Sequence, residues 1–275
     1  METALLNYFV FDTQLHSSCD LNPDILGKGA GIYEVLRVEQ GTPVFLQEHI
    51  DRFFSSAALE NIPVDISGKF IRQSVKLLIE QNRMHHGNIK FIYYWNSAND
   101  HRFMAWVMPF FYPAATHYNV GVVVGSMQAE RQNPNAKKIL YSLRKRADAL
   151  IKKEGFWEVV YVNSRGYLTE GSRSNIFFVL GSHVLTPELS LVLPGITRAK
   201  ILQLAAEKGI PLEETRIKLS EPEKFDACFL TGTSSKILPV SRLDNKIFDV
   251  QNKLMRMLME DYDELMVEDI RRFSW

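Results

Sequence analysis

The chain has 275 residues, 46% hydrophobic and 23% charged, which is the balance of a globular protein with one large or two medium domains. Its 32 basic and 32 acidic residues give a formal net charge of zero, which argues against a nucleic-acid-binding surface. Cys19 and Cys228 are too few for a disulfide framework, and no segment reaches 18 apolar residues. The composition therefore predicts a cytoplasmic protein that neither spans a membrane nor binds nucleic acid.

The first part of the chain combines strands with two helices. The spacing of its apolar residues predicts strands at 7–15, 31–45, 88–95 and 102–112, and helices at 46–62 and 67–84. Ser67 is the expected N-cap of the second helix, and Gly87 is its expected end. These elements predict a small N-terminal α/β domain over residues 1–115.

The second part of the chain has more strands. We expect strands at 119–127 and 228–243, hairpins at 156–170 and 175–187, and helices at 139–155, at 197–209 and from Val250 onward. Strands with interspersed helices, without regular βαβ alternation, favour an α+β (mixed α/β) fold in two domains. Residues 116–135 would contain a strand and the interdomain linker, and residues 136–275 would form the larger domain.

One turn and four other segments carry side chains that sheet packing does not require. Glu170 lies in the turn between two predicted strands, where Asn, Asp, Gly or Pro is usual. The Pro-Gly turn before Ile196 and Thr197 leads into a helix N-terminus, which is a natural anion site. Each feature taken alone also fits an ordinary surface turn, cap or charge. These segments are the Glu170 turn, the helix start at 195–197, the loop with Thr233 and Ser234, the helix with Arg52, and the lysine pair Lys137–Lys138.

Taken together, these features match the needs of one cofactor. Pyridoxal phosphate requires a lysine for its aldehyde, amide and cationic donors for its phosphate, and a carboxylate against its ring nitrogen. No metal site is predicted. The combination therefore favours a pyridoxal-phosphate enzyme.

Four segments also resemble signature segments of the class IV aminotransferases, the fold-type IV pyridoxal-phosphate enzymes. They are "YEVLRVEQGTPVFLQEHIDRFFSSA", "YLTEGSRSNIFFV", "VLPGITR" and "FLTGTSSKILPV", and the resemblance runs from about Gly29 to about Val240. It implies a small α/β sandwich domain plus a larger pseudo-barrel β domain with helices. It also implies a homodimer, because family active sites are completed by the small domain of a second subunit.

The resemblance assigns roles to individual residues. It implies that Glu170 faces the pyridine nitrogen, with Asn175 fixing the turn. The phosphate would be held by Arg52, Ile196, Thr197 and Thr233, with Gly195 allowing a close turn. Tyr33 and Ser234 would bind the substrate.

The Schiff-base lysine is chosen from Lys137 and Lys138. The Pro-x-x-Lys spacing from Pro134 selects Lys137, and this register places Tyr141 where branched-chain enzymes have a tyrosine on the cofactor's phenolic oxygen. Leu140 occupies the position where the family usually has Asn, so Lys138 stays the alternative.

Three functions remain open at this point. The first is a ping-pong aminotransferase that acts on a small, possibly branched-chain, amino acid and a 2-oxo acid. The second is a 4-amino-4-deoxychorismate lyase, which eliminates pyruvate with the same cofactor, and the third is a non-catalytic binding protein. Neither family specificity pattern is complete. The Arg-x-His arrangement that binds the substrate carboxylate in D-amino acid aminotransferases lacks its arginine, because the nearest stretch reads Asn99-Asp100-His101-Arg102. Lys90 falls near the position of an arginine in branched-chain enzymes, and a lysine is not a bidentate substitute for it. The sequence does not settle the substrate or its L or D configuration.

Overall fold

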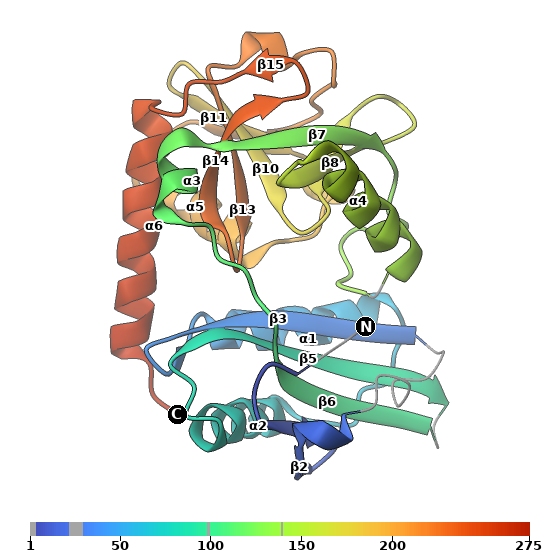
Figure 1. Cartoon of the computed structure of the whole chain (residues 1–275). Helices are drawn as coiled ribbons and strands as arrows, with labels where there is room; N and C mark the ends of the chain where they lie inside the picture. The colour runs from blue at the N-terminus through green and yellow to red at the C-terminus, as the bar shows by residue number, and fades with distance from the viewer. Residues whose placement is uncertain (1–3, 22–29, 98–99, 139) are drawn as a thin grey trace. The chain divides into compact units, whose positions relative to one another are not determined.

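The computed structural model describes residues 4–21, 30–97, 100–138 and 140–275 (Figure 1). The chain forms two compact units, and each is described here by itself. Unit 1 comprises residues 1–111, 136–139 and 266–275, and unit 2 comprises residues 112–135 and 140–265. The short segment that carries Lys137 clusters with unit 1, although the sequence analysis placed it at the start of the larger domain.

Unit 1 is built on a six-stranded antiparallel sheet with the order β2-β1-β6-β5-β3-β4. Its strands are β1 (Tyr8–Phe11), β2 (Gln14–Ser17), β3 (Ala30–Glu39), β4 (Thr42–Pro43), β5 (His86–Ser97) and β6 (Asp100–Met108), and a 3-10 turn, η1 (Ser18–Asp20), follows β2. The long β3–β5 pairing places Glu34 opposite Phe91 and Leu36 opposite Ile89. Since side chains opposite each other share a face, this pairing decides which residues of β3 enter the core.

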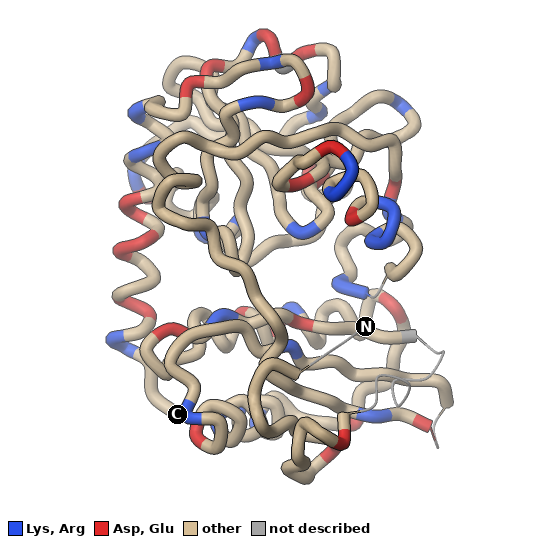
Figure 2. Tube along the Cα trace, viewed as in Figure 1, with Lys and Arg blue, Asp and Glu red and all other residues tan. Residues whose placement is uncertain are grey.

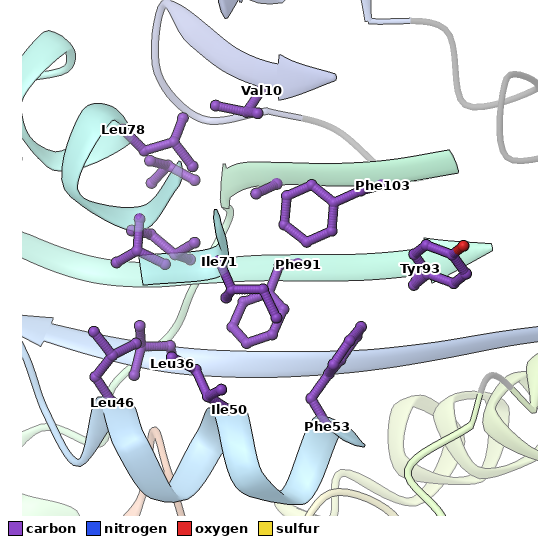
Figure 3. Close-up of a cluster of buried hydrophobic side chains, with 14 of the residues drawn as sticks. Val10, Leu36, Leu46, Ile50, Phe53, Ile71, Leu78, Phe91, Tyr93 and Phe103 are labelled. Carbon is purple, nitrogen blue, oxygen red and sulfur yellow. The ribbon is translucent and has the colours of Figure 1, made fainter. Parts of the chain in front are cut away.

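Two helices, α1 (Leu46–Leu59) and α2 (Gly68–Gln81), pack on one face of this sheet. Figure 3 shows Ile50 and Phe53 of α1 and Ile71 of α2 pointing toward Leu36 and Phe91 of the sheet. All five side chains are at most 2% exposed. Both helices lie where the apolar spacing of the sequence predicts them, and this core gives α1 a fixed position on β3.

The ends of α2 test the two capping predictions. The Ser67 hydroxyl accepts a hydrogen bond from the Phe70 N–H at 3.2 Å, which confirms the N-cap. The prediction for Gly87 is wrong, because α2 ends at Gln81 and Gly87 lies in β5. Its φ of +139°, and the 2.8 Å that would separate an added Cβ from the Phe110 ring, explain why this position is glycine.

Unit 2 is built on a nine-stranded mixed sheet. Its path is β12-β11-β10-β13-β14-β7-β8-β9, and β15 pairs with β14. The strands are β7 (Val122–Gln128), β8 (Glu158–Val162), β9 (Leu168–Gly171), β10 (Asn175–Leu180), β11 (His183–Pro187), β12 (Leu212–Thr215), β13 (Ala227–Gly232), β14 (Lys236–Leu243) and β15 (Lys246–Ile247). Neighbouring strands β10 and β13 place Asn175 opposite Thr231, so the turn that follows Glu170 ends beside the start of the loop with Thr233.

Among the described residues, the helices of unit 2 are α3 (Ala115–Val120), α4 (Tyr141–Glu154) and α5 (Ile196–Glu207), with 3-10 turns η3 (Leu189–Leu191) and η4 (Pro222–Lys224). The last helix, α6 (Lys253–Arg272), begins in unit 2, and its residues from Met266 onward belong to unit 1. The strand predicted at 119–127 begins at Val122 instead, because residues up to Val120 belong to α3 and Gly121, with φ +74°, ends that helix. Figure 2 shows charges of both signs along α6. No helix in the described residues is long and apolar enough to cross a membrane. The observed elements confirm the mixed α+β class.

Candidate functional site

The predicted site residues fall into two groups. Tyr33, Arg52 and Lys137 belong to unit 1. The members in unit 2 are Tyr141, Glu170, Asn175, Gly195, Ile196, Thr197, Thr233 and Ser234. We describe the geometry within each group.

Lys137 is held in unit 1 by its backbone. Its N–H donates to the Ser56 hydroxyl of α1 at 3.0 Å, and its carbonyl accepts from the Tyr33 N–H at 3.0 Å. The Lys137 ammonium lies 4.9 Å from the centre of the Tyr33 ring. The backbone contacts fix the start of the lysine side chain, which brings together two residues that the sequence analysis named separately.

Lys138, the alternative lysine, has a different environment. Its Nζ pairs with the Glu60 carboxylate at 3.0 Å, and the two side chains are 20% and 14% exposed. This ion pair engages the Lys138 nitrogen, whereas a Schiff base requires the lysine nitrogen for the aldehyde carbon. This contact favours Lys137 over Lys138.

Arg52 lies in a buried cluster with Glu34 and His49. Its Nε and Nη2 donate to the two oxygens of Glu34 at 2.7 and 2.6 Å, and His49 Nδ1 donates to Glu34 at 2.8 Å. Burial alone raises the pKa of Glu34, but the charge of Arg52 and the hydrogen bonds from Arg52 and His49 outweigh it and lower the pKa to about 2. Burial, together with the nearby charges of Arg52 and Lys137, lowers the pKa of His49 despite its contacts with Glu34, so the neutral ring donates this hydrogen bond.

Sequence reasoning missed Glu34. Its signal is an acidic residue between Ile32 and Leu36 on the inward face of an alternating strand, where an apolar residue is expected. The side chains of Ile32, Glu34 and Leu36 are all fully buried. A charge at such a position calls for a partner, but the sequence does not say which one.

Lys90 brings a second ammonium to Tyr33. Its Nζ lies 5.0 Å from the centre of the Tyr33 ring and 5.3 Å from that of Trp106, and the residue is 8% exposed. Both rings are within the range of cation–π attraction. The Tyr33 ring therefore contacts the ammonium groups of both Lys90 and Lys137.

In unit 2, Glu170 is a buried carboxylate at the end of β9, with 3% of the residue exposed. One oxygen accepts from Arg131 Nη1 at 2.5 Å, and the other accepts from the Leu193 N–H at 2.9 Å. The alternative left open by the sequence, that Glu170 is an ordinary surface-turn residue, is therefore wrong. Arg131 was not identified from the sequence, because an arginine in a polar loop carries no local signal of its partner.

A second carboxylate, Glu158, organises the turn that follows Glu170. Glu158 is 4% exposed and accepts hydrogen bonds from the Ser172 hydroxyl at 2.6 Å, the Ser172 N–H at 3.2 Å and the Arg173 N–H at 3.1 Å. It fixes residues 172–173, immediately after β9. No pattern in the sequence indicates this role, because Glu158 is a single polar residue in a predicted strand.

The N-terminus of α5 lies beside this turn. Asn175 Nδ2 donates to the Leu193 carbonyl at 3.0 Å, and a Cβ added to Gly195 would lie 2.0 Å from Asn175 Oδ1. Gly195 is thus required by a close approach, as the sequence analysis expected. It is the N-cap residue and offers no side-chain cap to Ile196 and Thr197, which are both buried. The first-turn N–H groups of such a helix point outward and favour an anion.

The remaining predicted residues occupy two further places in unit 2. Thr233 and Ser234 lie in the turn between β13 and β14, and a Cβ added to Gly232 would lie 3.4 Å from the Arg173 carbonyl. This turn therefore lies next to the Glu158-organised turn. Tyr141, the first residue of α4, is 62% exposed within this single chain.

The residues of unit 2 fit pyridoxal phosphate. The buried Glu170 carboxylate suits a ring-nitrogen cation, and the uncapped start of α5, without acidic residues in its first turn, suits the phosphate. A buried hydroxyl, Thr231 Oγ1, has no hydrogen-bond partner among the described residues. Such an atom beside a candidate site is consistent with a ligand contact.

Comparison with known proteins identifies the family. The family described as "Amino-transferase class IV" matches residues 31–243. The branched-chain-amino-acid aminotransferase of Pseudomonas aeruginosa is 30% identical over 241 residues, covering 79% of this chain and 77% of the relative. The D-alanine aminotransferase of Bacillus licheniformis is 27% identical over 230 residues, with 79% and 80% covered.

Solved structures show the same fold. The branched-chain aminotransferase of Escherichia coli has a TM-score of 0.87 at 21% identity, with 98% of both chains covered. A putative 4-amino-4-deoxychorismate lyase from Legionella pneumophila has a TM-score of 0.77 at 25% identity, with 88% of this chain and 91% of that chain covered. These matches confirm the fold type expected from the resemblance. The chain belongs to the class IV aminotransferase family, whose members use pyridoxal phosphate.

Proposed function

We propose that this protein is a pyridoxal-phosphate aminotransferase that moves an amino group from an amino acid with a small or branched side chain to a 2-oxo acid. The observation that carries the proposal is the buried Glu170 carboxylate, which is joined through Leu193 to the turn before α5. A ring-nitrogen partner and a phosphate site in one unit match the two ends of this cofactor. The named activities of the relatives support the same reaction.

Each residue has a defined task in this proposal. The bound cofactor supplies an aldehyde and a ring that stabilises negative charge at the substrate Cα. Lys137 Nζ would hold the aldehyde in the resting enzyme and, once the substrate amine has displaced it, would take the proton from Cα. Glu170 holds a proton on the ring nitrogen.

Further residues bind and orient the ligands. Arg52, the N–H groups of Ile196 and Thr197, and Thr233 bind the phosphate. Asn175 fixes the turn before Gly195, and Tyr141 donates a hydrogen bond to the phenolic oxygen. Tyr33 and Ser234 contact the substrate.

A half-reaction screen tests this function. The purified protein, loaded with pyridoxal phosphate, is mixed with single L- and D-amino acids and with 4-amino-4-deoxychorismate, and the absorbance of the bound cofactor is followed. We expect a rapid change with one or more small or branched-chain amino acids and release of the matching 2-oxo acid. A protein that stays colourless with added cofactor, or that responds to no amino acid, contradicts the proposal.

The alternative function is the lyase, which the similarity to the Legionella pneumophila structure favours. A lyase releases pyruvate from 4-amino-4-deoxychorismate in repeated turnovers without a 2-oxo acid acceptor. An aminotransferase stops after one half-reaction unless an acceptor is present. The same screen therefore separates the two reactions.

We also propose that the protein is a cytoplasmic homodimer. Both cysteines are free thiols, which suits a reducing compartment. Tyr33 lies in the segment through which the resemblance expects the partner subunit's site to be completed. Sedimentation and cell fractionation test the two statements, and a catalytically active monomer at assay concentration would overturn the first.

A further inference from the structure

A buried carboxylate lies between β3 and α1 in unit 1. Glu34 is fully buried and shares the inward face of β3 with Ile32 and Leu36. Figure 3 shows this face at Leu36, opposite Ile50 of α1. An ionised group in such an apolar layer is strongly unfavourable unless partners compensate it.

Two residues of α1 compensate this charge. Arg52 Nε and Nη2 each bond a different oxygen of Glu34, at 2.7 and 2.6 Å. A two-bond contact of this kind fixes the plane of the guanidinium as well as its position. His49, one turn earlier on α1, donates to Oε2 of Glu34 at 2.8 Å and so fixes the carboxylate in turn.

Stability alone is a weak reason for this arrangement. Buried ion pairs are often no more stabilising than apolar side chains of similar size, because desolvation offsets the attraction.

Strand β3 and helix α1, which carry this cluster, also hold Lys137. Ser56, one turn after Arg52, accepts from the Lys137 N–H, and Tyr33, the residue before Glu34, donates to the Lys137 carbonyl. The cluster therefore fixes Arg52 on the same two elements that fix Lys137.

We propose that Glu34, oriented by His49, is a positioning residue that holds the Arg52 guanidinium in the orientation in which it binds the cofactor phosphate. This inference rests on the proposed role of Arg52. Glu34 acts through Arg52 and does not touch the ligand. The role is specific to the phosphate, so a ligand without phosphate is unaffected by it.

The test compares two ligands on the full-length protein freed of cofactor. Dissociation constants are measured for pyridoxal phosphate and for pyridoxal, which has the same ring and aldehyde but no phosphate. Glu34→Gln keeps the shape of the side chain but offers only one acceptor oxygen to Arg52. We expect the affinity for pyridoxal phosphate to fall about tenfold or more while the affinity for pyridoxal stays unchanged. The ratio of the dissociation constant of pyridoxal to that of pyridoxal phosphate should therefore fall by the same factor. An unchanged ratio overturns the proposal.

A matched control is available on the same strand. Glu39 also pairs with an arginine and a histidine, Arg37 and His86, but its contacts are partly exposed. We expect Glu39→Gln to leave the ratio of the two dissociation constants unchanged. If Glu39→Gln lowers the ratio as much as Glu34→Gln does, the effect is a general loss of structure and the proposal is wrong.

Two further variants separate the possible failures. Arg52→Lys keeps the positive charge but removes the two-bond contact of the guanidinium with Glu34. When Glu34→Gln is added to Arg52→Lys, the double variant should have the same ratio as Arg52→Lys alone. If Arg52→Lys leaves the ratio unchanged, phosphate binding does not depend on the guanidinium of Arg52, and a proposal that rests on its orientation is wrong. If Arg52→Lys lowers it and Glu34→Gln does not, only the positioning role fails. Should Glu34→Gln not fold, His49→Phe replaces it, and an unchanged ratio there overturns the proposal.

Discussion

Arg131 and Glu170 form an ion pair in unit 2 in which Arg131 Nη1 lies 2.5 Å from Glu170 Oε1, with the side chains 13% and 4% exposed. The other oxygen of Glu170 accepts from the Leu193 N–H. A side chain and a backbone group therefore fix both oxygens of the carboxylate that we propose to face the cofactor ring. Such charge-assisted hydrogen bonds hold the carboxylate plane in one orientation.

The first prediction concerns Glu170. Glu170→Gln should fold with some loss of stability and should bind cofactor, because the amide is nearly isosteric but presents its NH2 group to one of the two donors, Arg131 or the Leu193 N–H. A neutral amide cannot hold the ring nitrogen protonated, so we expect turnover to fall about a hundredfold or more. Single-turnover kinetics measure this loss, and circular dichroism checks the fold. An unchanged single-turnover rate would show that Glu170 has no catalytic role.

The second prediction concerns Lys137. Lys137→Ala should abolish turnover and leave the protein folded, because the hydrogen bonds of Lys137 to Ser56 and Tyr33 are made by its backbone N–H and carbonyl. Assays of amino acid consumption measure the first effect, and thermal unfolding measures the second.

Lys138→Ala is the matched control for that variant. It removes the ion pair to Glu60, which at a largely buried position contributes about 1 kcal/mol, and should keep turnover. Borohydride reduction of the wild-type protein with bound cofactor, followed by peptide mapping, should place the label on Lys137. A label on Lys138 would move the assignment by one residue.

The third prediction concerns Glu158, the carboxylate under the turn that follows Glu170. In Glu158→Gln the amide presents donors to the N–H groups of Ser172 and Arg173, which now approach the carboxylate oxygens. We expect the free energy of unfolding to fall by about 1–3 kcal/mol. Urea unfolding measures the loss, with Glu213→Gln at an exposed position as the control. Equal stability of the two variants would contradict the role of Glu158.

The fourth prediction is a pH dependence of stability. The pKa of Glu34 is about 2 in the folded protein, below the ordinary value of 4.5. Because the pKa is lowered on folding, ionised Glu34 stabilises the folded state at any pH above the ordinary pKa of 4.5. This contribution is lost as the pH falls from that value toward about 2. The full loss is about 3 kcal/mol. The lowered pKa of His49 acts in the same direction, because acid must charge a buried ring.

Urea unfolding at a series of pH values tests this expectation. Glu34→Gln should be less stable than the wild-type protein near neutral pH and should lose less stability on acidification below the ordinary carboxyl pKa. Parallel curves for the two proteins would show that Glu34 is not the group responsible.

Local sequence patterns determined much of this protein. The apolar spacing located α1, α2 and α5, and the Ser67 cap is formed as predicted. The Pro-Gly pair before Ile196 marked a close turn at the start of a helix, and α5 begins there. Each of these features depends on residues within a few positions of one another. The helical spacing of apolar residues, the N-cap and the turn can therefore be predicted from the sequence.

The tertiary structure alone decided the pairing of the charged groups. Glu34 meets His49 and Arg52 across 15 and 18 residues, Glu170 meets Arg131 across 39, and the Lys137 N–H meets Ser56 across 81. Sheet register and the paths of loops bring these groups together, and neither follows from the spacing of residue types. Burial then selects the partners, because an ionised group removed from water needs its opposite charge or its hydrogen bonds within reach.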